Sequence, residues 1–70
     1  LARFTLSERS ALVGATVAEI EDHDDVSIVF LRHQGAPDMH PSGDRRLSAG
    51  DVIAVLGSPS QLNQMVVKSQ

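Results

Sequence analysis

The chain contains three stretches whose apolar residues have the spacing of β-strands. Residues 3–6 alternate polar and apolar side chains, residues 26–31 of a strand expected at 26–33 are apolar except for Ser27, and residues 52–56 are an uninterrupted apolar run. Runs of this kind are typical of strands that are covered on both faces. A weaker strand is expected at residues 38–40, after a turn at residues 34–37.

Two stretches carry the sequence signature of a capped helix. Thr16 is followed three residues later by Glu19, and Ser58 is followed by Pro59 and then by Gln61. In such a capping box, the first side chain accepts a hydrogen bond from the backbone of the third helical residue, whose side chain accepts one in return. Proline suits the first helical position because the N–H that it lacks would have no partner there. Helices are therefore predicted to begin after residues 16 and 58.

These two helices complete the predicted fold. The first is expected to be short and to end in the acidic residues 21–25. The second carries Leu62, Met65 and Val66 on one stripe, which indicates its buried side. Since no internal repeat interrupts the order β-α-β-β-β-α, the sequence predicts a single α+β domain over residues 1–70.

The chain is too short to bury a large core. Domains of about this size often depend on a disulfide, a metal or a partner subunit for stability. The chain of 70 residues has no cysteine, which excludes disulfides and thiolate zinc sites. Because the runs at residues 26–31 and 52–56 are apolar in both directions, we expect a second copy of the chain to cover the face that the helices leave free.

Charge and hydropathy restrict the partners that are expected. The net charge of −3, with six Lys and Arg and only two aromatic residues, argues against a nucleic-acid partner. No apolar run approaches the ~18 residues of a membrane helix, so direct insertion into a membrane is not expected. The chain begins at Leu1 without an initiator methionine or a signal pattern, and we therefore expect it to be a segment of a longer protein.

Four motifs in order suggest a family. Residues 12–20 read LVGATVAEI, and the apolar strand after them ends in Arg32, with Gly35 shortly after. Residues 41–47 run from a proline to a leucine, and residues 50–62 combine Gly-Asp, an apolar strand, a glycine and a helix start. Over nearly its whole length, the chain resembles the RCK C-terminal (TrkA-C) domain of potassium channel and transporter regulators.

The resemblance implies a cytoplasmic regulatory domain that forms homodimers and binds a small ligand or ion in the cleft between two copies. Binding would be transmitted to a membrane channel or transporter, potassium being the expected ion. A ligand-free oligomerisation module and a regulatory domain of an anion or amino-acid exchanger remain as alternatives. No enzyme is expected, because the chain has no nucleophile elbow. The resemblance names no cofactor, and a Gly-x-Gly-x-x-Gly nucleotide motif is absent.

Family position places the ligand beside the loop that follows the first helix. The residues expected to bind it are Asp22, His23, Asp25, Val26, Ser27 and Pro41. Relatives that respond to cyclic di-AMP have an arginine and an asparagine in this loop, where this chain is shorter and acidic. Because carboxylates repel a phosphodiester, the acidic loop argues against cyclic di-AMP, although Ser27 can replace one polar contact.

Other side chains allow further chemistry. Arg32, Arg45 and Arg46 are the only basic concentration that can meet an anionic ligand. Exposed ion pairs with Asp44 or Asp51 are the more common use of such arginines.

Two groups of titratable residues complete the set. Asp22, His23, Asp24 and Asp25 resemble a divalent-cation cluster, but a solvated loop is the favoured interpretation, so no metal is expected. His33 and His40 flank the expected hairpin and can form a pH-sensitive pair, although ordinary exposed residues are favoured because nothing in the sequence fixes their tautomer.

Overall fold

The structure, a computed structural model, describes all 70 residues and contains four strands and two helices. In chain order these are β1 (Ala2–Thr5), α1 (Val17–Asp24), β2 (Ser27–His33), β3 (Ala36–Asp38), β4 (Val52–Leu56) and α2 (Pro59–Ser69). The predicted order β-α-β-β-β-α and the α+β class are confirmed.

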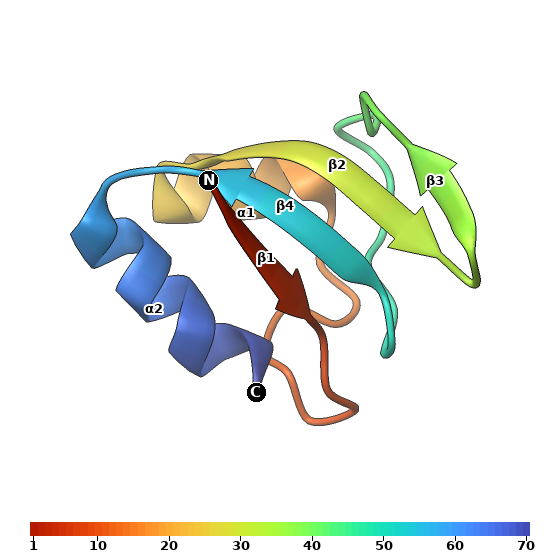
Figure 1. The fold of residues 1–70 in the computed structure, drawn as a ribbon, viewed down its shortest axis with the longest axis horizontal. Coiled ribbons are helices and arrows are strands. Elements are labelled where there is room, and N and C mark those ends of the chain that lie inside the picture. The colour runs from red at the N-terminus through yellow and green to blue at the C-terminus, as the bar shows by residue number, and fades with distance from the viewer.

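The four strands form one antiparallel sheet in the order β1-β4-β2-β3 (Figure 1). Strand β4 lies inside the sheet, paired with β1 on one side and β2 on the other. All five residues of this inner strand are apolar, and Ile53 and Val55 are completely buried.

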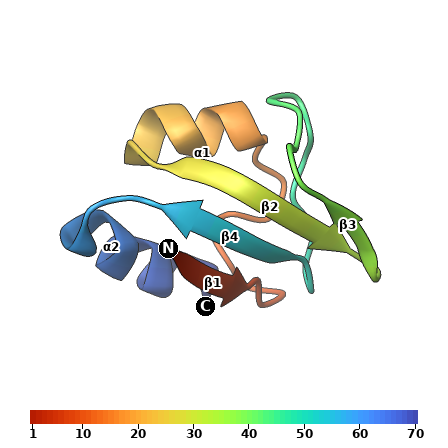
Figure 2. The same ribbon diagram turned by 45° about the horizontal axis from the view of Figure 1, so that its top comes forward.

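Both helices pack on the same face of the sheet (Figures 1 and 2). Their side chains Val17, Ile20 and Met65 join one core cluster with strand residues that include Leu31 and Ile53. Met65, Leu31 and Ile53 are completely buried. The core therefore lies between the two helices and one face of the sheet.

No helix covers the opposite face, which we call the open face. Strand register places Ala54 beside Arg3 and Phe30 on this face, and Leu56 beside Ser27. Phe30 and Ala54 are half-buried, and Leu56 is 47% exposed. The prediction that two strands are apolar in both directions is thus confirmed, and its consequence, a covering second copy, stays a prediction.

Both helix starts have the predicted capping boxes. Thr16 N donates to Glu19 Oε1 at 2.9 Å, and Glu19 N donates to Thr16 Oγ1 at 3.1 Å. The corresponding distances between Ser58 and Gln61 are 2.8 and 3.3 Å, and proline begins α2. Both predictions are therefore confirmed. A capping box can be predicted from the sequence because it depends on residues only three positions apart.

Several boundaries differ from the sequence prediction: β1 spans Ala2–Thr5 and not residues 3–6, and β2 begins at Ser27 and not at residue 26. The hairpin turn is confined to Gln34 and Gly35, whose positive φ values of 50° and 81° suit a two-residue turn matched to the twist of the strands. Strand β3 can then begin at Ala36, opposite His33, rather than at residue 38. Helix α1 ends at Asp24, within the acidic run where its end was expected, so Asp22 and His23, expected in the loop after the helix, are helical.

The buried side of α2 also differs in one residue. Met65 is buried and Leu62 is packed against the core, but Val66 is 43% exposed. Ser69, four residues after Met65, takes the next buried position. Its hydroxyl donates to Val66 O at 2.9 Å, which makes a polar residue compatible with burial.

Candidate functional site

The acidic residues after Ile20 mostly serve the fold instead of forming a solvated loop. Glu21 Oε2 accepts a hydrogen bond at 2.9 Å from the backbone N of Ile28, beside the β-bulge of β2. Asp25 ends α1 in the left-handed conformation, and its Oδ2 accepts a hydrogen bond at 3.0 Å from Gln61 Nε2. Two of these carboxylates therefore have fixed partners from other segments.

Asp24 lies between the two helices, and its side chain is only 6% exposed. Its Oδ1 accepts a hydrogen bond from Lys68 Nζ of α2, and His23 Nδ1 lies 3.4 Å from the same oxygen. Burial acts to raise the pKa of Asp24, but the hydrogen bonds from Lys68 and His23 and the positive charge of Lys68 outweigh it and lower that pKa. Asp24 is thus held as a carboxylate beside the core.

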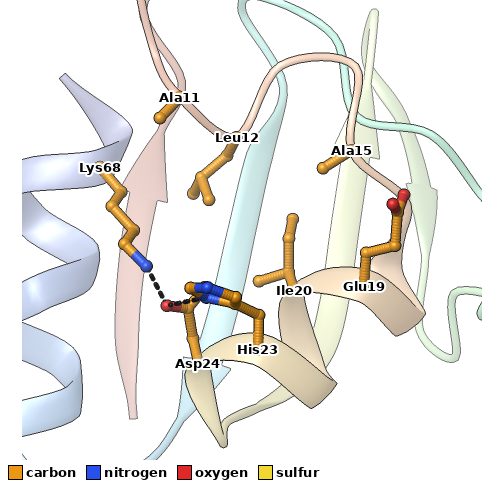
Figure 3. Close-up of a pocket in the computed structure, with 8 residues that line it drawn as sticks. All are labelled: Ala11, Leu12, Ala15, Glu19, Ile20, His23, Asp24 and Lys68. Atoms are coloured by element: carbon orange, nitrogen blue, oxygen red, sulfur yellow. Dashed lines mark hydrogen bonds and ion pairs between the residues drawn. The ribbon is translucent and has the colours of Figure 1, made fainter.

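A pocket of about 380 Å³ opens next to this ion pair (Figure 3). Helix α1, the loop before it and the end of α2 provide its walls, lined by Ala11, Leu12, Ala15, Glu19, Ile20, His23, Asp24 and Lys68. Its volume lies within the range of about 300–1,000 Å³ that small-molecule sites occupy. The pocket is therefore large enough to hold a ligand.

The capping box fixes a second carboxylate at the pocket. Two hydrogen bonds from Thr16 hold the pKa of the Glu19 carboxyl below its ordinary value. The bond from the Thr16 backbone has the larger effect, and the bond from the Thr16 side chain has the smaller one. Arg46 adds a smaller electrostatic contribution in the same direction. The pocket therefore has ionised carboxylates at two of its lining positions near neutral pH.

The residues expected to bind the ligand do not share one environment. Asp22, His23, Asp25 and Ser27 are exposed, and Pro41 is half-buried. Val26, by contrast, belongs to the core cluster at 7% exposure. Only His23 also lines the pocket. That the others bind a ligand stays a prediction.

The three arginines are spread over the domain. Arg32 pairs with Val52 and Pro37 in the sheet and is exposed. Arg45 Nη1 lies 3.5 Å from Asp38 Oδ2, and Arg46 Nη1 donates to the backbone O of Gly14 at 2.7 Å. The structure therefore gives Arg45 an acidic partner other than the two expected from the sequence.

The two histidines do not face each other across the hairpin. His33 Nδ1 lies 2.6 Å from Oδ1 of Asp51, whose side chain is 2% exposed and also accepts a hydrogen bond from Ser48 N at 2.8 Å. The backbone of His40, beyond β3, donates to Asp38. Contrary to the sequence interpretation, a buried carboxylate fixes the orientation of the His33 ring.

No group of three or more His, Cys, Asp or Glu residues is arranged to hold a metal ion. In the acidic run, Asp24 binds Lys68 and Asp25 binds Gln61. Asp22 is exposed and its carboxylate makes no hydrogen bond within the domain. The four residues named as weak metal candidates thus do not converge on one point.

Sequence reasoning did not find the pocket. Four of its lining residues are apolar (Ala11, Leu12, Ala15 and Ile20). In a sequence, apolar residues of this kind indicate a hydrophobic core and not a pocket. Lys68, which reaches Asp24 across 44 sequence positions, is a single basic residue near the end of the chain. The only local signal was the capping box that fixes Glu19.

Known structures with this fold include two assemblies of BusR from S. agalactiae. The RCK_C domain dimer of BusR in complex with c-di-AMP matches with a TM-score of 0.83 and 20% identity, over 96% of this chain and 91% of that chain. BusR in complex with its busAB-promotor DNA matches with a TM-score of 0.83 and 22% identity, over 96% of this chain and 34% of that chain.

A third structure widens the range of relatives. The GsuK RCK domain matches with a TM-score of 0.68 and 21% identity, over 96% of this chain and 16% of that chain. The chain thus spans only a small part of two of these three chains. No curated protein matches this chain.

The DNA complex corrects one expectation from the sequence. Net charge argued against a nucleic-acid partner, yet a protein containing this fold binds promoter DNA. The matched region is about a third of that chain. Because the charge of one domain does not restrict what the remainder of a longer protein binds, the exclusion of nucleic acid was wrong.

The family assignment rests on the sequence as a whole. The model of the TrkA-C domain matches residues 1–67. This match covers both capping boxes, the acidic run and every residue that lines the pocket except Lys68. No helix of the chain is long and apolar enough to cross a membrane. The chain belongs to the TrkA-C domain family, the C-terminal domain of RCK proteins.

Proposed function

We propose that this domain is a ligand-sensing regulator that acts in the cytoplasm as a homodimer and controls a cation channel or transporter. Potassium is the ion we favour, because the motifs resemble those of potassium channel and transporter regulators. Membership of the TrkA-C family supports the regulatory role. We infer binding, not catalysis, because the sequence contains no nucleophile elbow.

The open face is the observation that carries the proposed dimer. It presents Phe30, Ala54 and Leu56, and Leu56 is 47% exposed. A small domain gains stability when a partner covers such an apolar surface. The relative solved with c-di-AMP is itself a dimer, which supports the same arrangement here.

Two of the predicted ligand residues, Ser27 and Asp25, lie near one end of this face. Ser27 pairs with Leu56 at the edge of the open face, and Asp25 is exposed two residues before it. If two copies meet through this face, the ends of their α1 helices approach the interface. A ligand there would shift the population between two dimer arrangements by its difference in affinity for them.

The dimer is tested by sedimentation of the 70-residue chain at several concentrations. Leu56→Glu places a charge on the open face and is expected to give a monomer that stays folded, because Leu56 is already half exposed. Val67→Glu is the matched control, since Val67 is 71% exposed on α2, away from the open face. A wild-type chain that is monomeric at all concentrations would exclude the proposed dimer.

Ligand sensing is tested by thermal melting with a panel of nucleotides, including cyclic di-AMP, and of monovalent and divalent cations. A ligand at 100 times its dissociation constant stabilises the native state by about 2.7 kcal/mol, which shifts the midpoint by roughly 10–20 °C in a domain of this size. A midpoint that no ligand moves would instead favour a structural oligomerisation module.

A second function is favoured by the DNA complexes. The two BusR structures with promoter DNA match at TM-scores of 0.83 and 0.82, above the 0.68 of the GsuK RCK domain. The same domain can therefore regulate a DNA-binding protein in place of a membrane carrier. Sequencing the regions that flank this domain in its parent would separate the two, because one requires a DNA-binding domain and the other a link to membrane helices.

A further inference from the structure

The pocket between α1 and α2 is complete within one subunit and shares only His23 with the residues predicted for the dimer cleft. Its floor is apolar and belongs to the rigid core: Leu12 and Ile20 are each 3% exposed, and Ala15 is packed against the core cluster. A ligand with an apolar body would therefore find a preformed surface on which that body leaves water.

The charged groups of the pocket favour a cation. Glu19 and Asp24 are acidic and Lys68 is the only lysine or arginine among the lining residues, so negative charge is in excess when His23 is neutral. Lys68 already forms an ion pair with Asp24, so the charge of Asp24 offsets its attraction for an anionic ligand. An anionic ligand would face two carboxylates, whereas an ammonium group would be attracted by both.

Asp24 also retains capacity to accept hydrogen bonds. Both hydrogen bonds that it receives, from Lys68 and His23, end at Oδ1. Oδ2 has no partner within the domain, and no buried side-chain oxygen or nitrogen lacks a partner, so Oδ2 is in contact with solvent. A carboxylate that is largely buried yet has one free oxygen is suited to bind a donor group from a ligand.

We propose that this pocket binds a small organic cation, specifically a primary amine on a short apolar chain. The ammonium group donates to Asp24 Oδ2, and the chain packs on Leu12 and Ile20 in the direction of Glu19, whose charge at the other end of α1 adds a longer-range attraction. Figure 3 shows the acidic side chains on α1, next to this apolar floor. The proposal goes beyond the proposed function, because it needs neither a second subunit nor a ligand between subunits.

The test uses the 70-residue chain and n-pentylamine, followed by ¹H–¹⁵N correlation spectra. We expect saturable shifts in the amides of Ala11, Ala15, Ile20 and His23. n-Pentanol, which has the same apolar body without charge, should bind about tenfold more weakly, and n-pentanoate should not bind. Equal binding of pentanol and pentylamine, or tighter binding of pentanoate, would overturn the proposal.

Variants separate charge from shape. Glu19→Gln removes a charge while keeping the capping box, because Gln61 already performs the same role in α2. It is expected to weaken amine binding by about two- to fivefold, whereas Glu8→Gln, at an exposed site outside the pocket, should have no effect. Ala11→Leu fills the pocket from an exposed position and should abolish binding.

Two outcomes would contradict this assignment. Equal losses in Glu19→Gln and Glu8→Gln would show that only net charge attracts the amine. Unchanged binding in Ala11→Leu would place the amine elsewhere. Failure of the dimer is distinguishable, because the Leu56→Glu chain should still bind pentylamine with the affinity of the wild type.

Discussion

The two helices begin in the same way but are attached to the domain at opposite ends. In α1 the first backbone donors are all used: Val17 N donates to Arg45 O at 2.9 Å, and Ala18 N donates to Gly43 O at 2.8 Å. In α2 the last carbonyls are used instead, since Lys68 O accepts from Ala11 N at 3.1 Å. One helix is thus fixed at its N-terminus and the other at its C-terminus.

This difference explains the contacts between the helices. The end of α1 that no loop holds is joined to α2 by Asp24 with Lys68 and by Asp25 with Gln61. Each helix therefore supports the less anchored part of the other through side chains. The pocket lies between them, at the place where side-chain contacts replace backbone hydrogen bonds. We infer that the junction of the two helices is the region best suited to respond to a ligand.

The largest expected effect concerns the single completely buried side chain of α2. Met65→Ala should lower the free energy of unfolding by about 2–5 kcal/mol, because it leaves a cavity against the sheet. Val66→Ala, the next residue and 43% exposed, should change it by less than about 0.5 kcal/mol. Urea denaturation of both variants measures the difference. Similar losses would show that α2 does not depend on one anchoring residue.

The ion pair between the helices should have the next largest effect. Lys68→Met leaves the Asp24 carboxylate largely buried without its main partner, and should cost about 1–3 kcal/mol. Because the pKa of Asp24 is lowered in the native state, its ionised form stabilises the fold at neutral pH. That contribution is present above the ordinary value of 3.8 and is lost as pH falls through the native pKa below it.

Denaturation from neutral to acidic pH tests this sign. The stability difference between the wild type and Asp24→Asn should be largest near pH 7 and should shrink as Asp24 becomes protonated in the wild type. Asp22→Asn is the control, because the Asp22 carboxylate is exposed and makes no hydrogen bond within the domain. A difference that does not depend on pH would contradict the role given to the Asp24 charge.

The sequence predicted the parts of the fold that depend on neighbouring residues. Both capping boxes and the inner strand β4 needed only residues within a few positions of one another. The partner of the Asp24 carboxylate is instead Lys68, 44 positions away, and the orientation of His33 depends on Asp51, 18 positions away. Contacts of this kind have no local pattern, so the pocket could not be predicted either.

The smallest of these effects compares the two capping residues directly. Thr16→Ala and Ser58→Ala should each cost about 1 kcal/mol, because each removes the acceptor for one backbone N–H of the first turn. The first turn of α1 keeps its hydrogen bonds to Arg45 O and Gly43 O. The first turn of α2 has no backbone hydrogen bonds to a neighbouring loop. Hydrogen exchange should therefore accelerate across the first turn of α2 in Ser58→Ala but remain local in Thr16→Ala. Equal acceleration in both variants would mean that loop contacts do not hold α1, and the contrast between the helices would then rest on their C-terminal ends alone.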